Sequence, residues 1–279
     1  MRYRELHPKP PLSHFVECFW TLEGENTSEP VQAERILPDG CIELILNFGD
    51  RFSQHSGVKR FDQPRHFLVG QMTGPILISP MGAVELIGVR FHPGGTLPFL
   101  RLPLYEMTDK LVELGNLAQH FERELLEVSV DLPTISNRVA AIESLLLSYV
   151  LRFKHDSCCL RLAATIVDSA GLMSVDQLAT DAGVSTRQLE RRFLREVGIT
   201  PKLLSRILRF QQVFRAVERS DASWAPVAVE CGYYDQAHLI RDFNQFAQQT
   251  PAVLFAEQTE LTQSFTRKAR TSHFSNTTS

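Results

Sequence analysis

Basic residues recur along one stretch in the second half of this 279-residue chain, at the spacing of a helix surface. Arg187, Arg191 and Arg195 follow one another at four-residue intervals, so they lie on one side of a helix. The other side is apolar and consists of Leu189, Phe193 and Val197. A guanidinium bonds well to phosphate or, through two parallel hydrogen bonds, to the edge of guanine. The spacing therefore predicts a helix that buries one face and presents arginines to nucleic acid.

The pattern around these arginines occurs twice. The matching pairs are Ala179 and Ala228, Gly183 and Gly232, Leu189 and Leu239, Phe193 and Phe243, and Pro201 and Pro251. The offset is 49 at the glycines and 50 from the leucines onward, so the second copy has one extra turn residue. Self-similarity of this kind indicates two copies of one small helical unit.

Each copy has the capping and turn residues of a helix-turn-helix. Gly183 and Gly232 each end a short helix in a left-handed cap, and Ser185 and Asp235 each open a second helix as its N-cap. The side chains that we predict to contact DNA in the first copy are Ser185, Arg187, Gln188, Glu190, Arg191 and Arg195, with Lys202 and Arg206 from the helix that follows. Those in the second copy are Gln236, Ala237, Ile240 and Arg241.

The types of these side chains suit base reading. Arginine pairs with guanine, glutamine with adenine, and an apolar side chain contacts the thymine methyl group. Glu190 has two interpretations, since it either reads cytosine or pairs with a neighbouring arginine. Residues 202 to 217 form one amphipathic pattern between the two copies and predict a long linker helix. A rigid pair of reading helices about 34 Å apart meets successive major grooves.

Residues from about 156 to 257 resemble the DNA-binding domain of the AraC/XylS family of bacterial transcription regulators. The matching segments are Leu178-Ala179, Gly183-Val184-Ser185, Thr200-Pro201, Val227-Ala228, Cys231-Gly232-Tyr233, Asp235-Gln236, His238-Leu239 and Thr250-Pro251. Two segments of the first part, Leu37 to Leu44 and Gly88 to Gly95, resemble an uncharacterised N-terminal domain of one subgroup. The resemblance implies a cytoplasmic regulator, an activator or a repressor, that binds double-stranded promoter DNA and contacts RNA polymerase.

Charge is distributed unevenly along the chain. Its net charge of −3 and pI near 6.3 are unlike those of a typical DNA-binding protein. Residues 185–215 nevertheless carry eight basic and two acidic groups, whereas residues 216–260 carry two basic and seven acidic groups. Because phosphate attraction scales with local positive charge, we expect the first unit and the linker helix to supply most of the affinity.

The first hundred residues have the pattern of short strands between turns. Strands are predicted near 15–22, 41–48, 67–69 and 84–91. The Gly and Pro residues in the turns between them suggest a sandwich or small barrel. From residue 105 the period changes to that of helices, over 114–128, 135–153 and 159–169. The expected fold class is α+β, with a β-rich N-terminal sandwich-like or barrel-like domain with helices, then an all-α domain with two helix-turn-helix units.

We predict three parts. Residues 1–155 form a sensing or dimerisation domain, β-rich to about 100 and helical over 105–155, and the family resemblance places a homodimer surface on its helices. Residues 156–257 form the DNA-binding domain, with units at about 175–198 and 224–248. Residues 258–279 are expected to be disordered, since ten of the 21 residues from Thr259 onward are Ser or Thr.

Other classes of function have little support in the sequence. No run approaches the roughly 18 apolar residues of a membrane helix, and no apolar signal region follows Met1. Five cysteines without C-x-x-C spacing favour reduced thiols in the cytoplasm. No enzyme motif, cofactor motif or metal-ligand set is visible, so none of these is expected.

The ligand of the N-terminal domain, a small-molecule effector if there is one, is left open. His92, in the turn before Pro93-Gly94-Gly95, is either a turn residue or a weak candidate for a ligand contact. Two alternatives remain, a ligand-processing enzyme domain fused to a DNA-binding module and a regulator that needs no ligand. A deep, polar-lined pocket would favour sensing, and a packed barrel would favour the ligand-independent regulator.

Overall fold

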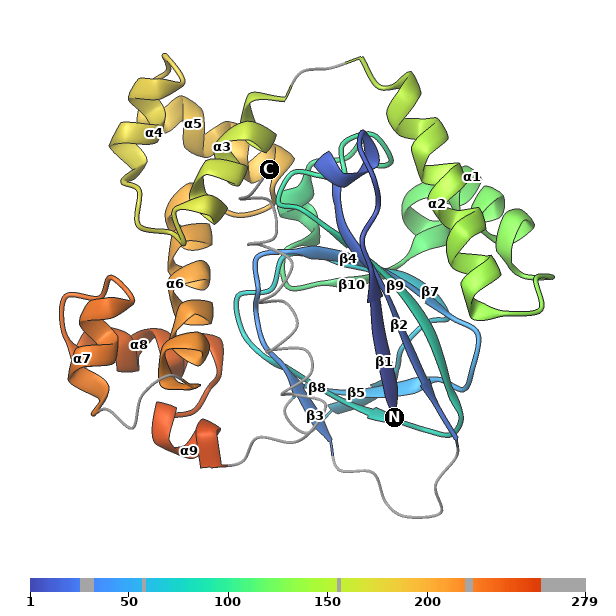
Figure 1. The fold of residues 1–279 in the computed structure, drawn as a ribbon, viewed down its shortest axis with the longest axis horizontal. Coiled ribbons are helices and arrows are strands. Elements are labelled where there is room, and N and C mark those ends of the chain that lie inside the picture. The colour runs from blue at the N-terminus through green and yellow to red at the C-terminus, as the bar shows by residue number, and fades with distance from the viewer. Residues whose placement is uncertain (26–32, 57–58, 155–156, 219–222, 257–279) are drawn as a thin grey trace.

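The computed structural model describes residues 1–25, 33–56, 59–154, 157–218 and 223–256. The predicted tail and the predicted boundary at residue 155 therefore lie outside the described residues. Figure 1 shows a β domain with two helices on one side and a bundle of helices on the other. The expected fold class, a β-rich domain with helices followed by an all-α domain, is confirmed.

The β domain contains two antiparallel sheets. Sheet A has the strand order β1-β2-β9-β4-β7-β10. Its strands are β1 (Arg2–Leu6), β2 (Val16–Gly24), β4 (Ile42–Asn47), β7 (His66–Val69), β9 (Val84–Phe91) and β10 (Leu111–Glu113). Sheet B has the order β3-β8-β5-β6. Its strands are β3 (Glu34–Ile36), β5 (Phe52–Ser56), β6 (Lys59–Asp62) and β8 (Ile76–Pro80).

The central strands of sheet A are buried on both faces. Side chains alternate between the two faces of a strand. One set from β4 and β9 faces the helices α1 (Leu114–Ser129) and α2 (Ile135–Arg152). These helices cover the sheet with residues such as Phe121 and Ile142. The other set faces sheet B and packs with Phe52. This explains the nearly continuous apolar runs over 42–46 and 86–91, because a strand buried on both sides has no polar alternation.

The helical domain is built around α6 (Pro201–Glu218), as Figure 1 shows. The first group consists of α3 (Cys158–Asp168), α4 (Val175–Asp181) and α5 (Thr186–Glu196), and the second of α7 (Trp224–Glu230), α8 (Gln236–Phe246) and α9 (Pro251–Ala256). Both groups share one hydrophobic cluster with α6. Phe210 and Phe214 of α6 pack edge-to-face, and Phe210 also contacts Phe243 and Phe246 of α8.

Some local expectations differ from the structure. Residues 104–107 form the 3-10 helix η2 and residues 111–113 form β10, so the helical part begins at Leu114 rather than at residue 105. None of the four strands of sheet B was predicted; β5 and β6 are short and polar, and β3 and β8 are also short. Trp224 packs on Phe255 of α9, which in turn packs on Phe214 of the linker helix.

None of the described helices is both long and apolar enough to cross a bilayer.

Gly88 sits at a close approach inside the β domain. A Cβ atom there would lie 2.0 Å from Cε2 of Trp20, because the indole ring lies directly over β9. We expect Gly88→Ala to displace Trp20 and destabilise the protein by about 1–3 kcal/mol through overpacking. Urea unfolding followed by circular dichroism measures this. Gly24→Ala is the control, since its nearest contact is the flexible Met1 side chain at 3.2 Å. Equal losses in the two variants would contradict the assignment.

Candidate functional site

Both predicted helix-turn-helix units are present with the expected caps. Gly183 has φ +64° and Gly232 has φ +76°. Their amides bond back to the carbonyls of Thr180 and Val229, at 3.0 Å in each case. The next amides, of Val184 and Tyr233, bond to Ala179 and Ala228 at 3.1 and 2.9 Å. This pair of bonds is a Schellman motif, so each glycine turns the chain sharply between the two helices.

The N-caps fix where each second helix starts. Ser185 Oγ accepts from the amide of Gln188, and Gln188 Oε1 accepts from the amide of Ser185, which forms a reciprocal capping box on α5. Asp235 Oδ1 accepts from the amide of His238 at 2.7 Å on α8. Ser185 and Gln188 therefore have a structural role in the free protein, and their contacts with DNA stay a prediction.

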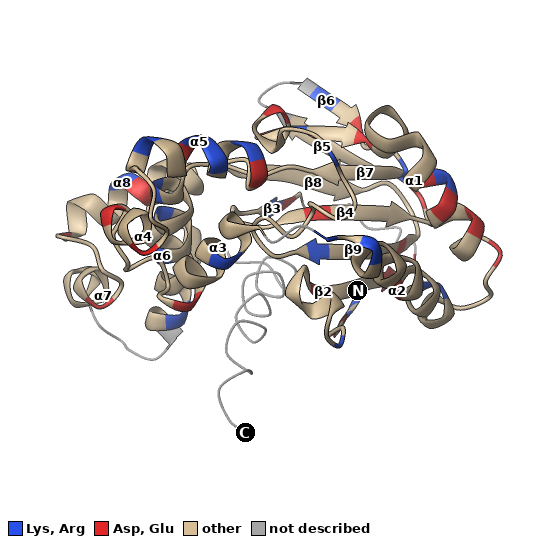
Figure 2. Ribbon diagram, turned by 90° about the horizontal axis from the view of Figure 1, so that it is seen from above, with Lys and Arg blue, Asp and Glu red and all other residues tan. Residues whose placement is uncertain are grey.

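The outer face of α5 is strongly basic. Arg187, Arg191, Arg192 and Arg195 are all exposed, and Leu194 is 36 % exposed among them. Figure 2 shows these basic residues gathered along α5. Glu190 forms no ion pair in the described part of the chain, and both interpretations of this residue stay predictions. Leu189 and Phe193 are fully buried below, so packing holds the arginines outward.

The corresponding face of α8 is less charged. Gln236, Ala237 and Arg241 are exposed, and Arg241 Nε donates to the carbonyl of Ala237 at 3.3 Å. Ile240 is half-buried and packs against the core, so only part of it is available to a thymine methyl group. The His238 ring meets Tyr233 edge-on at 5.1 Å, as expected for a packing residue.

The two residues predicted on α6 have different surroundings. Lys202 is exposed in the first turn of the helix. Arg206 Nη2 lies 2.6 Å from Asp242 Oδ1 and 2.6 Å from Gln245 Oε1, and its guanidinium lies over the Phe246 ring. Asp242 is 1 % exposed. The periodicity of the linker helix predicted an outward Arg206. In the structure its side chain instead bonds to partners on α8, so it joins the linker helix to the second unit.

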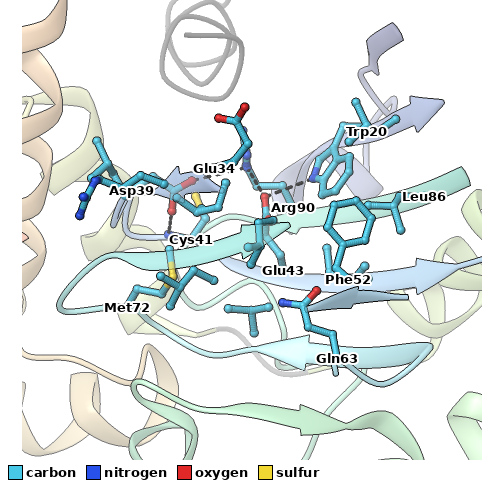
Figure 3. Close-up of a pocket in the computed structure, with 18 of the residues that line it drawn as sticks. Trp20, Glu34, Asp39, Cys41, Glu43, Phe52, Gln63, Met72, Leu86 and Arg90 are labelled. Atoms are coloured by element: carbon cyan, nitrogen blue, oxygen red, sulfur yellow. Dashed lines mark hydrogen bonds and ion pairs between the residues drawn. The ribbon is translucent and has the colours of Figure 1, made fainter. Parts of the chain in front are cut away.

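A second candidate site is a cavity between the two sheets, shown in Figure 3. It has an empty volume of about 1030 Å³ including its opening. Trp20, Phe52 and Phe67 form aromatic walls, and Asp39, Glu43 and Arg90 form a polar end. Gln63 Nε2 donates to Gln54 Oε1 at 3.0 Å at the edge of sheet B. Sequence patterns did not reveal this site, because its residues come from strands far apart in the chain.

Arg90 organises the polar end of this cavity. Its Nε lies 2.7 Å from Glu43 Oε1 and 3.6 Å from Asp39 Oδ2, and Trp20 Nε1 donates to Glu43 Oε1 at 3.2 Å. Burial raises the pKa of the Glu43 carboxyl, and the charge of Arg90 opposes that rise. Burial also raises the pKa values of the Cys18 and Cys41 thiols, so both stay protonated and unreactive at neutral pH.

The loop that follows β3 joins the cavity to the helical domain. Leu37 lines the cavity and also belongs to the core of the helical domain. Gln211 of α6 donates from Nε2 to the carbonyl of Pro38 at 2.5 Å. Gly40, at φ +87°, approaches Leu204 so closely that a Cβ would lie 2.8 Å from it. Arg35 Nη1 donates to the carbonyl of Ala247 at 3.1 Å, directly after α8.

His92 does not line the cavity. Its amide bonds to Phe15 and its carbonyl accepts from Gly95 at 2.7 Å, which agrees with a turn role. Among the described residues, no group of three or more His, Cys, Asp or Glu side chains is arranged to hold a metal ion. The assignment of His92 as a weak candidate for a ligand contact stays a prediction.

Paired helix-turn-helix units with a basic reading face define a DNA-binding transcription regulator. Residues 178–257 match the family described as a helix-turn-helix domain, and residues 4–113 match the one described as a domain of unknown function (DUF6597). Residues 178–257 therefore form an AraC-type helix-turn-helix domain, and they follow that N-terminal domain, in agreement with the resemblance to AraC/XylS regulators. No curated protein matches the chain.

The solved structures to which the chain is similar have little sequence in common with it. ToxT from Vibrio cholerae is 10 % identical, with 84 % of this chain and 97 % of that chain covered and a TM-score of 0.44. Wild-type ToxT with a bound unsaturated fatty acid is 9 % identical, with 84 and 94 % covered and a TM-score of 0.42. The AraC-like transcriptional activator CuxR is 14 % identical, with 73 and 74 % covered and a TM-score of 0.22. The assignment of the two domains rests on the matches to the two domain families.

The contrast between Arg206 and Lys202 is testable. Arg206→Ala leaves the buried Asp242 carboxylate without its partner, so we expect a loss of about 3 kcal/mol in the free energy of unfolding. Lys202→Ala, on the same helix but exposed, is expected to change stability by less than about 0.5 kcal/mol. Urea unfolding measures both variants. An Arg206→Ala protein as stable as the wild type would show that the pair does not hold α8 to α6.

Proposed function

We propose that the protein binds promoter DNA in a sequence-specific manner, with α5 and α8 in successive major grooves on one side of the duplex. The observation that carries this proposal is the exposed arginine face of α5, held outward by buried Leu189 and Phe193. A helix of about three turns fits the major groove, and its arginines reach guanine edges and phosphates there. Arg187, Arg191 and Arg195 are assigned these contacts.

The two units are proposed to contribute unequally. Around α5 and α6 the basic residues outnumber the acidic ones, whereas the second unit has Glu230 and Asp235 exposed close to Gln236 and Arg241. Because counterion release follows the number of phosphates neutralised, α5 supplies most of the affinity. Gln236 and Arg241 then add sequence discrimination through a weaker contact. Glu190, half-buried on α5, is proposed to accept from cytosine.

The N-terminal domain is proposed to control this binding by sensing an effector. The cavity between the sheets has a polar end, and this favours sensing over the ligand-independent alternative. Leu37 and Gln211 connect the cavity to α6, which carries both reading helices. An effector shifts the affinity for DNA only to the extent that it binds one arrangement of this connection more tightly than the other.

Two further partners belong to the proposal. RNA polymerase is proposed as a partner from the resemblance to AraC/XylS regulators. The helices α1 and α2 are proposed as a homodimer surface, and Val130 and Leu151 expose 49 and 67 % of their surface there. A protein that sediments as a monomer with and without DNA would remove the homodimer from this proposal.

The unequal roles of the two reading helices lead to a mutational prediction. We expect Arg191→Ala to weaken binding by roughly tenfold or more, because a base or phosphate contact in the major groove is lost. Arg241→Ala is expected to weaken it by less than about threefold, since α8 contributes the smaller electrostatic share. The measurement is a gel-shift titration on a duplex that the wild-type protein selects from a random-sequence library.

Arg101→Ala serves as the control for loss of positive charge, since Arg101 is exposed in the N-terminal domain. Repeating the titrations at several salt concentrations separates the electrostatic contribution, since each phosphate contact removed lowers the salt slope by about one. Equal losses for Arg191→Ala and Arg241→Ala would contradict the unequal roles. Wild-type binding that is no tighter to the selected duplex than to a scrambled one would overturn the proposed function.

A further inference from the structure

The turn between α7 and α8 is one residue longer than the turn between α4 and α5. In the first unit a single residue, Val184, separates the capping glycine from the N-cap Ser185, whereas in the second unit Tyr233 and Tyr234 both lie between them. Tyr233 corresponds to Val184, because the amide of each bonds back to a carbonyl of the preceding helix. Tyr234 is therefore the additional residue, and the reading faces of α5 and α8 do not include it.

The two tyrosines of this turn have opposite surroundings. Tyr233 is 4 % exposed, and the guanidinium carbon of Arg209 on α6 lies 5.8 Å from the centre of its ring. On another side the ring meets His238 edge-on at 5.1 Å. Tyr234 is 90 % exposed, the largest fraction among the exposed large apolar and aromatic side chains of the described residues. The core thus anchors Tyr233, and the next residue extends into solvent.

The exposed tyrosine lies at the start of the second reading helix. It precedes the N-cap Asp235, whose Oδ1 accepts from the amide of His238 at 2.7 Å and so fixes where α8 begins. Gln236 and Ala237, the first residues of the helix, are exposed as well. Within the described part of the chain the Tyr234 hydroxyl has no hydrogen-bond partner, so both its proton and its oxygen are available. A recognition helix inserts this end into the major groove.

Positive charge is scarce around this turn. Residues 223–256 contain one basic residue, Arg241, against three acidic ones, whereas α5 alone carries four arginines. A helix in the major groove has the phosphates of the groove edges beside it and needs donors for them. Uncharged side chains, tyrosine among them, bond to phosphate oxygens as arginine and lysine do. An uncharged donor therefore suits a unit that has few cations.

We propose that Tyr234 is a further DNA-binding residue, whose hydroxyl donates a hydrogen bond to a phosphate oxygen at the edge of the groove that α8 reads. The bond positions the first turn of α8, with Gln236 and Ala237, over the bases. This contact rests on the proposed function, since it requires α8 in a major groove. It differs from the contacts of the α5 arginines in its response to salt, because an uncharged donor releases no counterion from the phosphate.

The variant Tyr234→Phe removes the hydroxyl and keeps the ring. In gel-shift titrations of the full chain on the selected duplex, we expect it to weaken binding about fivefold, the usual contribution of one hydrogen bond. The slope of log affinity against log salt is expected to stay unchanged, whereas loss of a charged phosphate contact lowers it by about one. Tyr105→Phe is the matched control, since Tyr105 is an exposed tyrosine of η2 in the β domain, and it should bind as the wild type does.

Modified duplexes locate the bond on the DNA. A methylphosphonate linkage replaces one phosphate oxygen by a methyl group and removes the negative charge. Duplexes with one such linkage, placed in turn at each backbone position of the selected site, are titrated with the wild type and with Tyr234→Phe. At one position in the segment read by α8, we expect the linkage to weaken the wild type about fivefold more than the variant, because the variant has no bond to lose. Elsewhere both proteins are expected to lose affinity equally.

The outcomes for Tyr234 and for the proposed function are distinguishable. A Tyr234→Phe protein that binds as tightly as the wild type overturns the contact, as does a loss of affinity with a lowered salt slope. A loss without any backbone position at which the two proteins differ overturns the assignment to phosphate. In each of these cases the proposed function stands as long as the wild type prefers the selected duplex to a scrambled one. A wild type without that preference overturns the proposed function itself.

Discussion

The central strands of sheet A have no face in contact with bulk water, and this double burial sets the arrangement around them. One face is covered by α1 and α2, and the other by sheet B. Each fully buried large apolar side chain on these faces contributes about 1.5–3 kcal/mol, so neither cover is dispensable. Sheet B has four short strands against six in sheet A. The space that it does not fill becomes the cavity, and the polar side chains there bond mainly to one another.

The loop from Leu37 to Cys41 is the second element on which function depends. It forms part of the cavity wall, supplies Asp39 to the polar end, and places Leu37 in the core of the other domain. Tight packing makes such a shared segment sensitive to small displacements. In this structure the β domain and the helical domain are therefore in contact through side chains that belong to both.

Features set by neighbouring residues were predictable from the sequence. The glycine caps, the N-cap at Ser185 and the buried faces of α5 and α8 all depend on residues within a few positions, and all are present. The cavity depends on Asp39, Glu43 and Arg90, which only the strand pairing of β4 with β9 brings together. Arg206 shows the same limit, because periodicity gives its direction from the helix but not its partner on α8. The polar strands of sheet B lacked the apolar alternation that marks a strand.

The bond between Arg206 and Asp242 has a further consequence for the DNA. Together with the aromatic packing of Phe210 and Phe243, it fixes the angle of α8 on α6, while α5 shares the same core. The two helices proposed to read DNA are thus held at a fixed distance and a fixed rotation relative to each other. Each base pair inserted between their two recognition segments rotates the second by about 35° around the duplex axis. Under the proposed function, the operator is therefore one continuous element of constant spacing, rather than two half-sites separated by a spacer of variable length.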